Sequence, residues 1–367
     1  MKYLPENRLV GRCKMANEKK GTAFQKFLPV VTLILSVGFL LSFFCTTDGA
    51  ETLKHVLRTL CPQWAAAAVL AVAAGWFLEG WSLNILCRHL NSGWRYGRSF
   101  LTGMTGLFYG AVSPCGAVSQ PMQIYMMSRM GMDAGTAGSV VVVRSLVYQS
   151  VMVVYALFMV VFQLRFFQTA VSNFAFVTVI GLTVNTACIA LVVLFLVREK
   201  MTDRILSAIL RFLHRVRLCK DPQARYKAIT GQLRLFHDAA YVMGRSARLY
   251  FSAGSVTVLQ ITIGSLIPYF IYRSFRLRGI SVTTMAAAQV FTTMASSFVP
   301  LPGSAGGAEL GFYSFFRLFF GSSILPALLL WRILTYYLNI LFGGVFAFAG
   351  SRRGKTDEKS RACNRPG

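Results

Sequence analysis

The sequence predicts an all-α, polytopic membrane protein, a helical bundle of about six full spans with two further elements interrupted by proline and glycine. Hydrophobic residues make up 55% of the 367 positions, charged residues make up 14%, and the mean hydropathy is +0.54. Several apolar runs reach the roughly 20 residues that a helix needs to cross a hydrocarbon core. The basic residues gather in the gaps between these runs.

The uninterrupted spans lie within one transmembrane unit, residues 27–349, which basic tails at 1–26 and 350–367 flank. We expect these spans at 27–44, 64–87, 137–162, 174–197, 249–272 and 325–349. The largest polar stretch, residues 198–248, is rich in arginine and lysine. Apolar residues recur within it at helical spacing, which predicts an amphipathic helix that binds anionic lipids of the inner leaflet. Those residues are Ile205, Leu206, Ile209, Leu210 and Leu213.

Two elements, at 100–129 and 283–320, are apolar but cannot be continuous helices, because proline and glycine interrupt both of them near the middle. The interruptions are Pro114, Gly116 and Pro121 in the first element, and Pro300, Pro302, Gly303, Gly306 and Gly307 in the second. Irregular backbone at membrane depth persists only where protein buries it or where it lines a wet cavity. We therefore expect the working site at these interruptions.

The distribution of basic residues predicts how these two elements lie in the membrane. The chain has 38 lysines and arginines against 13 acidic residues, a net charge of +25. Because basic loops favour the cytoplasmic side, both tails and residues 198–248 are expected there. This holds if each interrupted element is a re-entrant hairpin, although Arg273, Arg276 and Arg278 then lie outside. The hairpins would enter from opposite faces, as in an inverted repeat, in a multi-pass protein of the cell membrane.

The ionisable residues inside the apolar elements are candidate ligands for a charged group. Arg144 and Arg332 suit a phosphate, because the guanidinium fork matches its oxygens. Internal ion pairs with Glu79 or Glu309 are an equally good interpretation. Glu309, near the start of the helix that follows the second interruption, would bind a cationic group, or else cap that helix or pair with Arg317 or Arg332. Glu79 lies near the end of its span and is close enough to reach water.

Neutral groups add to this candidate site. Gln120 offers an amide in the first interruption, and the backbone N–H groups around Gly116, Gly303, Gly306 and Gly307 suit an anion. Cysteines and histidines do not occur at metal-ligand spacing, and the sequence has no nucleotide-binding or hydrolase motif, so we expect no cofactor and no metal.

The segment P-L-P-G-S-A-G-G-A-E-L-G-F at 300–312 resembles the second signature of the lysylphosphatidylglycerol synthase transmembrane region family, which is also described as flippase-like. The segment S-P-C-G-A-V-S-Q-P at 113–121, with the residues that follow it, resembles the first signature of that family. This family usually has Gly-Gly-Glu/Gln-Pro there, where this chain has Val118-Ser119-Gln120-Pro121. The resemblance extends over roughly residues 25–350.

The resemblance implies a flippase that moves an anionic or aminoacylated phospholipid, such as a phosphatidylglycerol derivative, between leaflets. In the multiple peptide resistance factors, which confer resistance to cationic antibiotics, a separate cytosolic domain transfers lysine from lysyl-tRNA to phosphatidylglycerol. No such domain follows the last span, so we do not expect phosphatidylglycerol lysyltransferase activity unless a soluble synthase partner supplies it and brings tRNA. Two alternatives remain open: the membrane subunit of such a transferase, and a scaffold for a cell-envelope glycosyltransferase.

Overall fold

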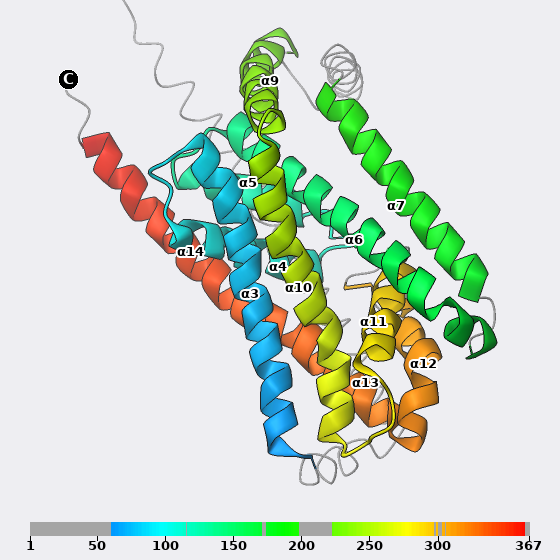
Figure 1. Ribbon diagram of the computed structural model, residues 1–367. Helices are drawn as coiled ribbons and strands as arrows, with labels where there is room; N and C mark the ends of the chain where they lie inside the picture. Colours follow the sequence, from blue (N-terminus) through cyan, green and yellow to red (C-terminus); the bar gives the residue numbers. More distant parts are fainter. Residues whose placement is uncertain are drawn as a thin grey trace, which may run out of the picture.

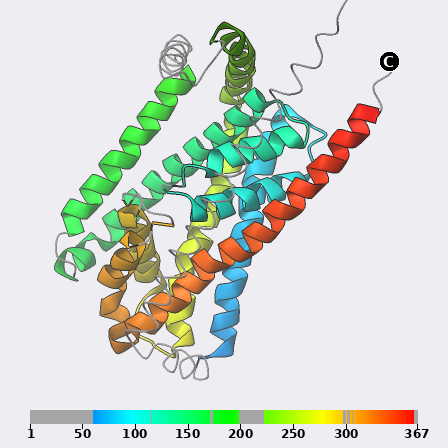
Figure 2. The ribbon, with the colours of Figure 1, turned by 180° about the vertical axis from the view of Figure 1, so that it is seen from behind.

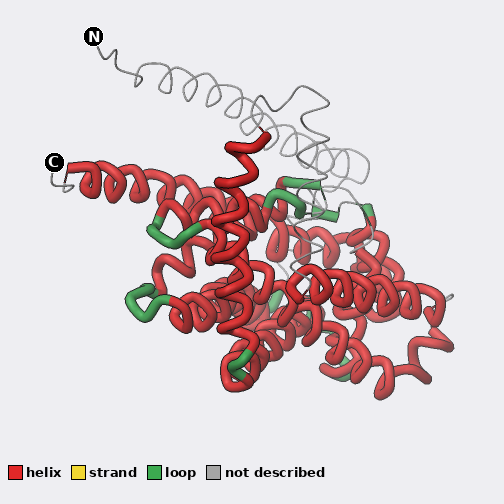
Figure 3. The backbone as a smooth tube through the Cα atoms, turned by 90° about the horizontal axis from the view of Figure 1, so that it is seen from above, coloured by secondary structure: helices red, strands yellow, loops and turns green. Residues whose placement is uncertain are grey.

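A computed structural model describes residues 60–114, 116–170, 174–197, 222–296, 299, 303–304 and 306–363. The predicted first span at 27–44, the apolar positions of 205–213, Pro300 and Pro302 lie outside the described residues. Helices account for nearly all of the described chain and are joined by short loops (Figure 3). Within these residues, four stretches are long and apolar enough to cross a membrane: Pro62–Leu90, Ala134–Gln163, Ala247–Ser274 and Gly307–Gly350. The predicted class, an all-α membrane protein, is confirmed.

Two long antiparallel helices, α3 (Pro62–Leu90) and α10 (Ala247–Ser274), form the axis of the bundle (Figure 1). A proline at the first position starts α3, where its missing N–H costs nothing. The side chain of Ser246 caps α10 by accepting from Leu249 N at 3.3 Å. Cys61 N donates to Ser274 O at 2.8 Å, so the start of α3 lies against the end of α10.

The first interrupted element is a hairpin of α4 (Tyr96–Val112) and α5 (Ser119–Arg129). Its two ends lie together, because Trp94 before α4 packs in the same buried cluster as Met130 after α5. That cluster also holds Leu86 from the last turns of α3 and Leu249 from the first turn of α10. The element therefore opens at the end of the bundle where α3 finishes.

The second interrupted element is a hairpin of α11 (Val282–Ser296) and α12 (Gly307–Phe320). Met285 near its start and Phe320 at its end belong to one buried cluster, which also contains Ala68 of α3 and Ile271 of α10. This hairpin opens where α3 begins, so the two hairpins enter the bundle from opposite ends (Figures 1 and 2). Both elements double back as predicted; the membrane face from which each enters stays a prediction.

The C-terminal part of the chain crosses the bundle as one long, composite helical rod. After the 3₁₀ turn Gly321–Ser323, α13 (Ile324–Arg332) passes through a π turn at Ile333–Tyr337 into α14 (Leu338–Cys363). A π turn fits an extra residue into a helix and changes the direction of the side chains around it. The helix continues beyond the predicted end of its span, and takes in most of the tail predicted at 350–367.

The remaining helices cover one side of this core. Long α6 (Ala134–Ala170) follows the first hairpin, and α7 (Phe174–Val197) lies at the periphery against it (Figures 1 and 2). Helix α9 (Pro222–Gly244) packs on the start of α6. The contact is close, because a Cβ atom at Gly135 would lie 2.0 Å from Gln232 O. Gly135 N also donates to Gln232 Oε1 at 2.8 Å.

Candidate functional site

A cavity of about 490 Å³ lies where the interrupted parts of the two hairpins meet in the middle of the bundle. Gly116 and Ser119 line it from the first hairpin, and Gly303 and Ser304 line it from the second. The Tyr336 hydroxyl donates to Ala111 O at 3.3 Å, which joins the two halves at this point. Cavities of this size are typical of sites for small ligands. Each interruption thus contributes one of its predicted glycines, Gly116 and Gly303, to the same cavity.

On one side of the cavity, Arg144 of α6 forms an ion pair with Glu79 of α3. Gln260 Nε2 of α10 donates to the same carboxylate oxygen at 3.0 Å. The Arg144 guanidinium carbon also lies 5.7 Å from the centre of the Tyr148 ring, a cation–π distance. Three helices thus hold one guanidinium group at the cavity wall.

On the other side, Arg332 at the end of α13 lies 2.7 Å, through Nη2, from Glu309 Oε2 of α12. Its Nη1 donates to Gly303 O at 3.2 Å. The guanidinium carbon lies 5.3 Å from the centre of the Tyr336 ring. Arg332 thereby connects the end of α13 to the second interruption. Like Arg144, it lines the cavity.

The backbone of the second interruption depends on glycine. Gly303 has φ +57° and Gly306 has φ +82°, in the left-handed region that glycine occupies without strain. A Cβ atom at Gly303 would lie 2.1 Å from the Tyr336 ring, so this close approach also excludes a side chain. Gly306 N donates to Glu309 Oε2 at 2.7 Å, so one of the N–H groups predicted to bind an anion already has a partner.

The two arginines occur in the same short sequence pattern, R-x-L-x-Y, in the helices that follow the two hairpins. It reads R-S-L-V-Y at 144–148 and R-I-L-T-Y at 332–336. Residues four apart lie on the same face of a helix, so each tyrosine lies beside its arginine. In both cases the arginine and the tyrosine line the cavity, so the two halves of the chain contribute matching pairs.

Each of the two arginines has a buried donor that the protein does not pair. Within the described residues, the Nε–H groups of Arg144 and Arg332 are buried and have no hydrogen-bond partner, and the same is true of Trp331 Nε1. The described cavity lining contains two guanidinium groups but only one carboxylate, Glu79. An anion with several acceptor oxygens, such as a phosphodiester, suits a cavity lined by two guanidinium groups.

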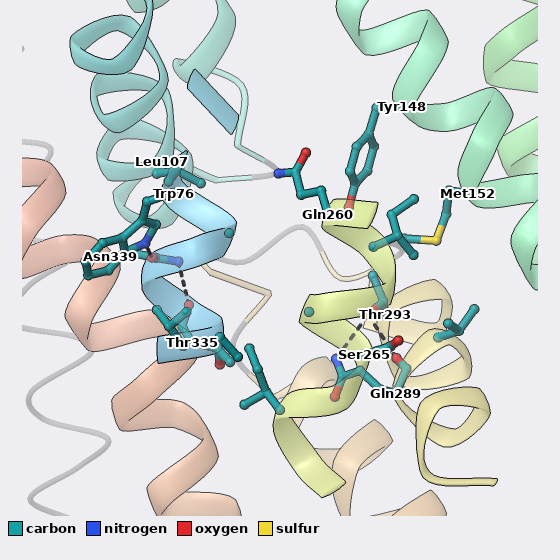
Figure 4. Close-up of a pocket in the computed structure, with 17 residues that line it drawn as sticks. Trp76, Leu107, Tyr148, Met152, Gln260, Ser265, Gln289, Thr293, Thr335 and Asn339 are labelled. Atoms are coloured by element: carbon teal, nitrogen blue, oxygen red, sulfur yellow. Dashed lines mark hydrogen bonds between the residues drawn. The ribbon is translucent and has the colours of Figure 1, made fainter. Parts of the chain in front are cut away.

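A second chamber of about 300 Å³ adjoins the first. Leu107, Tyr148, Gln260, Thr335 and Asn339 line both. Figure 4 shows the second chamber between the elements that carry Trp76, Met152 and Gln289. Its described lining is mostly apolar and includes no charged side chain. The site therefore has an arginine chamber, the cavity of about 490 Å³, and this uncharged chamber.

Of the five predicted headgroup-binding residues, four line the arginine chamber and one, Glu309, does not. Gln120, Arg144, Arg332 and Glu79 line the arginine chamber, where Gln120 Nε2 donates to Ser145 Oγ at 3.1 Å. Glu309 is not among its described lining residues and instead caps α12 and pairs with Arg332. The expectation that Glu79 reaches water is wrong, because the residue is 4% exposed and paired with Arg144.

The interruptions that the structure describes have different environments. Gly116 and Gly303 line the arginine chamber, whereas Gly307 lies against Val299, and a Cβ there would be 2.1 Å from Val299 Cγ2. Pro114 and Pro121 are exposed.

Sequence reasoning missed three kinds of lining residue. Tyr148 and Tyr336 were detectable, because the R-x-L-x-Y pattern recurs after both interrupted elements. Gln260 and Gln289 carry no such signal, since each is one amide in an otherwise ordinary apolar helix. Asn339, which accepts from Trp76 Nε1 at 2.6 Å, lies after the π turn, and no motif in the sequence indicates that turn.

Comparison with known proteins gives two matches. The family model described as the lysylphosphatidylglycerol synthase transmembrane region matches residues 30–343. A UPF0104 membrane protein of Archaeoglobus fulgidus is 23% identical over 329 residues, which cover 86% of this chain and 95% of the relative. The family match includes the two interrupted elements and the helices that carry the arginines.

Proposed function

Because the chain belongs to the lysylphosphatidylglycerol synthase transmembrane region family, we propose that it is a translocase that moves an anionic phospholipid between the leaflets of the cell membrane. The observation that carries this proposal is that Arg144 and Arg332, one from each half of the chain, line one cavity. A lipid phosphate is an anion that would enter such a site from the membrane.

The headgroup would occupy the arginine chamber while the acyl chains stay in the bilayer. Moving a charged headgroup through hydrocarbon alone is costly, because the charge loses its hydration. Arg144 and Arg332 replace that hydration on two sides of one cavity, and Glu79 and Glu309 compensate their charges when the headgroup is absent. The site is thereby stable both empty and loaded.

The arrangement of the hairpins supports movement from one face to the other. The first hairpin and Arg144 belong to one half of the chain, and the second hairpin and Arg332 belong to the other. In transporters built from opposed repeats, one half rocks against the other around a site at the midplane. The matching Arg–Tyr pairs would then hold one phosphate in turn as the cavity opens to each side.

The same proposal gives the chain an orientation. Both termini and residues 198–248 would lie in the cytoplasm, where their basic residues meet anionic inner-leaflet lipids. Of that segment, the structure describes helix α9, which packs on α6.

Proteoliposomes test the proposal. The purified chain is reconstituted into vesicles that contain a trace of fluorescent phosphatidylglycerol, and a membrane-impermeant quencher reports the fraction of label in the outer leaflet over time. We expect the protected inner-leaflet fraction to become accessible faster than in vesicles without protein. If vesicles with and without the protein show equal rates for every labelled lipid tested, anionic and zwitterionic, the proposed function is overturned.

A further inference from the structure

Glu79 is the one carboxylate among the described lining residues of the arginine chamber, and its two oxygens are held differently. Its Oε2 forms the ion pair with Arg144 and accepts from Gln260 Nε2 at 3.0 Å. Its Oε1 has no hydrogen-bond partner among the described residues, yet it is not one of the fully buried unpaired atoms. The side chain is 6% exposed. Oε1 is therefore the atom to which a proton from the chamber would bind.

The groups around Glu79 include a single positive charge in contact with it. The other charged or titratable residues of the described chamber wall are Arg144, Tyr148, Arg332 and Tyr336. Of these, Arg144 and Tyr148 of α6 lie close enough to interact with the charge of Glu79. Helix α10 contributes a neutral amide, and α4 approaches through Gly103, where a Cβ atom would lie 3.0 Å from Glu79 Cγ. Arg144 is thus the group that stabilises Glu79 in its ionised form.

The second half of the chain holds its carboxylate in a different way. Glu309 Oε2 accepts from Gly306 N at 2.7 Å in addition to its pair with Arg332. It lies in the first turn of α12, where the helix dipole also favours a negative charge. Glu309 therefore keeps stabilising partners when Arg332 turns to a ligand. Glu79 lies in the interior of α3, away from both helix ends, and would keep only the amide of Gln260.

An anion in the chamber changes the balance of charge. Without a ligand, the two arginines and the two glutamates cancel. A lipid phosphate adds one negative charge and competes with Glu79 for the guanidinium group of Arg144. A buried carboxylate without its counter-charge is costly, and protonation removes this cost because a neutral carboxyl group needs only hydrogen bonds. Binding of a phosphodiester therefore favours the uptake of one proton.

We propose that Glu79 takes up a proton when a lipid phosphate draws Arg144 away, so that one proton moves with each anionic lipid. The inference rests on the proposed function and names the ion coupled to it. The proton comes from the solution to which the chamber is open and binds Oε1, while Gln260 Nε2 keeps its bond to Oε2. When the lipid leaves, Arg144 returns to Glu79 and the proton is released. Because the lipid and the proton together carry no net charge, a pH gradient drives this movement and a membrane potential does not.

Proton uptake on lipid binding tests the inference without requiring transport. The purified full-length chain, in weakly buffered detergent near neutral pH, is mixed with short-chain phosphatidylglycerol. A pH-indicator dye and an equilibrium binding assay give the number of protons taken up for each lipid bound. We expect about one proton for phosphatidylglycerol and none for phosphatidylcholine, whose headgroup supplies its own positive charge. In Glu79→Gln, which keeps the shape of the side chain but cannot ionise, uptake should fall to near zero.

The matched control is Glu309→Gln, the same change at the carboxylate of the other half. It should keep an uptake of about one proton for each lipid bound, because the proposed proton acceptor is intact. Binding of phosphatidylglycerol by the unmodified chain without proton uptake, or with the same uptake as for phosphatidylcholine, would overturn the inference even if a variant failed to fold. Uptake that persists in Glu79→Gln would also overturn it.

Proteoliposomes separate this inference from the proposed function. With the interior about one pH unit below the exterior, acyl-labelled phosphatidylglycerol should become enriched about tenfold in the outer leaflet, because coupled movement equalises the product of proton and lipid activities. A membrane potential set with valinomycin and potassium should leave this distribution unchanged. Rapid movement to an even distribution under the pH gradient would contradict only this inference. Proton uptake on binding without any lipid movement would contradict the proposed function and leave the protonation of Glu79 in place.

Discussion

The ion pair between Glu309 and Arg332 allows the most detailed prediction. Glu309 Oε2 lies 2.7 Å from Arg332 Nη2 and accepts from Gly306 N at 2.7 Å, so one carboxylate oxygen holds both the last helix and the start of α12. The two side chains are 9% exposed for arginine and 13% exposed for glutamate. Glu309→Gln removes the charge but keeps an oxygen that can accept from Gly306 N.

The size of the effect follows from burial. Removing one partner of a fully buried ion pair costs about 3–5 kcal/mol, because the other charge remains buried without compensation. Arg332 borders a cavity of about 490 Å³ and retains its bond to Gly303 O and the face of Tyr336, all of which reduce that cost. We therefore expect Glu309→Gln to lower the free energy of unfolding by about 2–3 kcal/mol, below the full cost of a buried pair.

A double-mutant cycle measures this pair. The free energy of unfolding is determined in mixed micelles for the unmodified chain, Glu309→Gln, Arg332→Gln and the double variant. Because the double variant leaves no unpaired charge, its destabilisation should be smaller than the sum of the two single effects by about 1–3 kcal/mol. Strictly additive effects would refute the assignment of Glu309 as the structural partner of Arg332.

Two further predictions concern residues that line the arginine chamber, Gly303 and Arg144. Gly303→Ala should lower the free energy of unfolding by about 1–3 kcal/mol, because its φ is positive and the new Cβ meets the Tyr336 ring. The control Gly231→Ala, with nothing within 4 Å of the new Cβ, should be neutral or stabilising by up to about 1 kcal/mol. Equal losses of stability in the melting curves of the two variants would contradict the reasoning about Gly303. Arg144→Lys should slow lipid movement in proteoliposomes about tenfold or more without unfolding the chain. The reason is that an ammonium group cannot reproduce the planar contacts of the guanidinium group to the Glu79 carboxylate and to the Tyr148 ring. An unchanged rate would show that positive charge alone is sufficient.

Much of the fold follows from the sequence because its signals are strong. Long apolar runs predicted the bundle, and proline and glycine at 113–121 and 300–307 marked both interruptions. The distribution of basic residues then favoured hairpins over crossings, and the structure shows both elements doubling back. The last apolar stretch ends at Gly350, close to the predicted end of the span at 349, and the backbone then continues as helix to Cys363.

The site was predictable in its charges but not in its pairings. Arg144 and Arg332 stood out because ionisable groups are rare in apolar spans, and ion pairs were an open alternative to ligand binding. Glu79 and Arg144 are 65 residues apart in sequence, so only the packing of α3 against α6 brings them together. Gln260 and Gln289 are single amides in apolar helices, and only the packing of α10 against α11 brings both to the uncharged chamber.

The most direct test of the central claim, that lipid passes through the arginine chamber, is a reversible block of that chamber. Ser145 lines it on α6, and Ser145→Cys changes one atom. Leu157→Cys on the same helix, at a residue 47% exposed on the outer surface, is the control. After reaction with a bulky thiol-specific methanethiosulfonate, we expect lipid movement in proteoliposomes to stop in Ser145→Cys and to recover when a reductant removes the attached group. In Leu157→Cys and in the unmodified chain, lipid movement should continue unchanged after the same reaction. Undiminished movement through a chamber shown by mass spectrometry to be fully labelled would contradict the account.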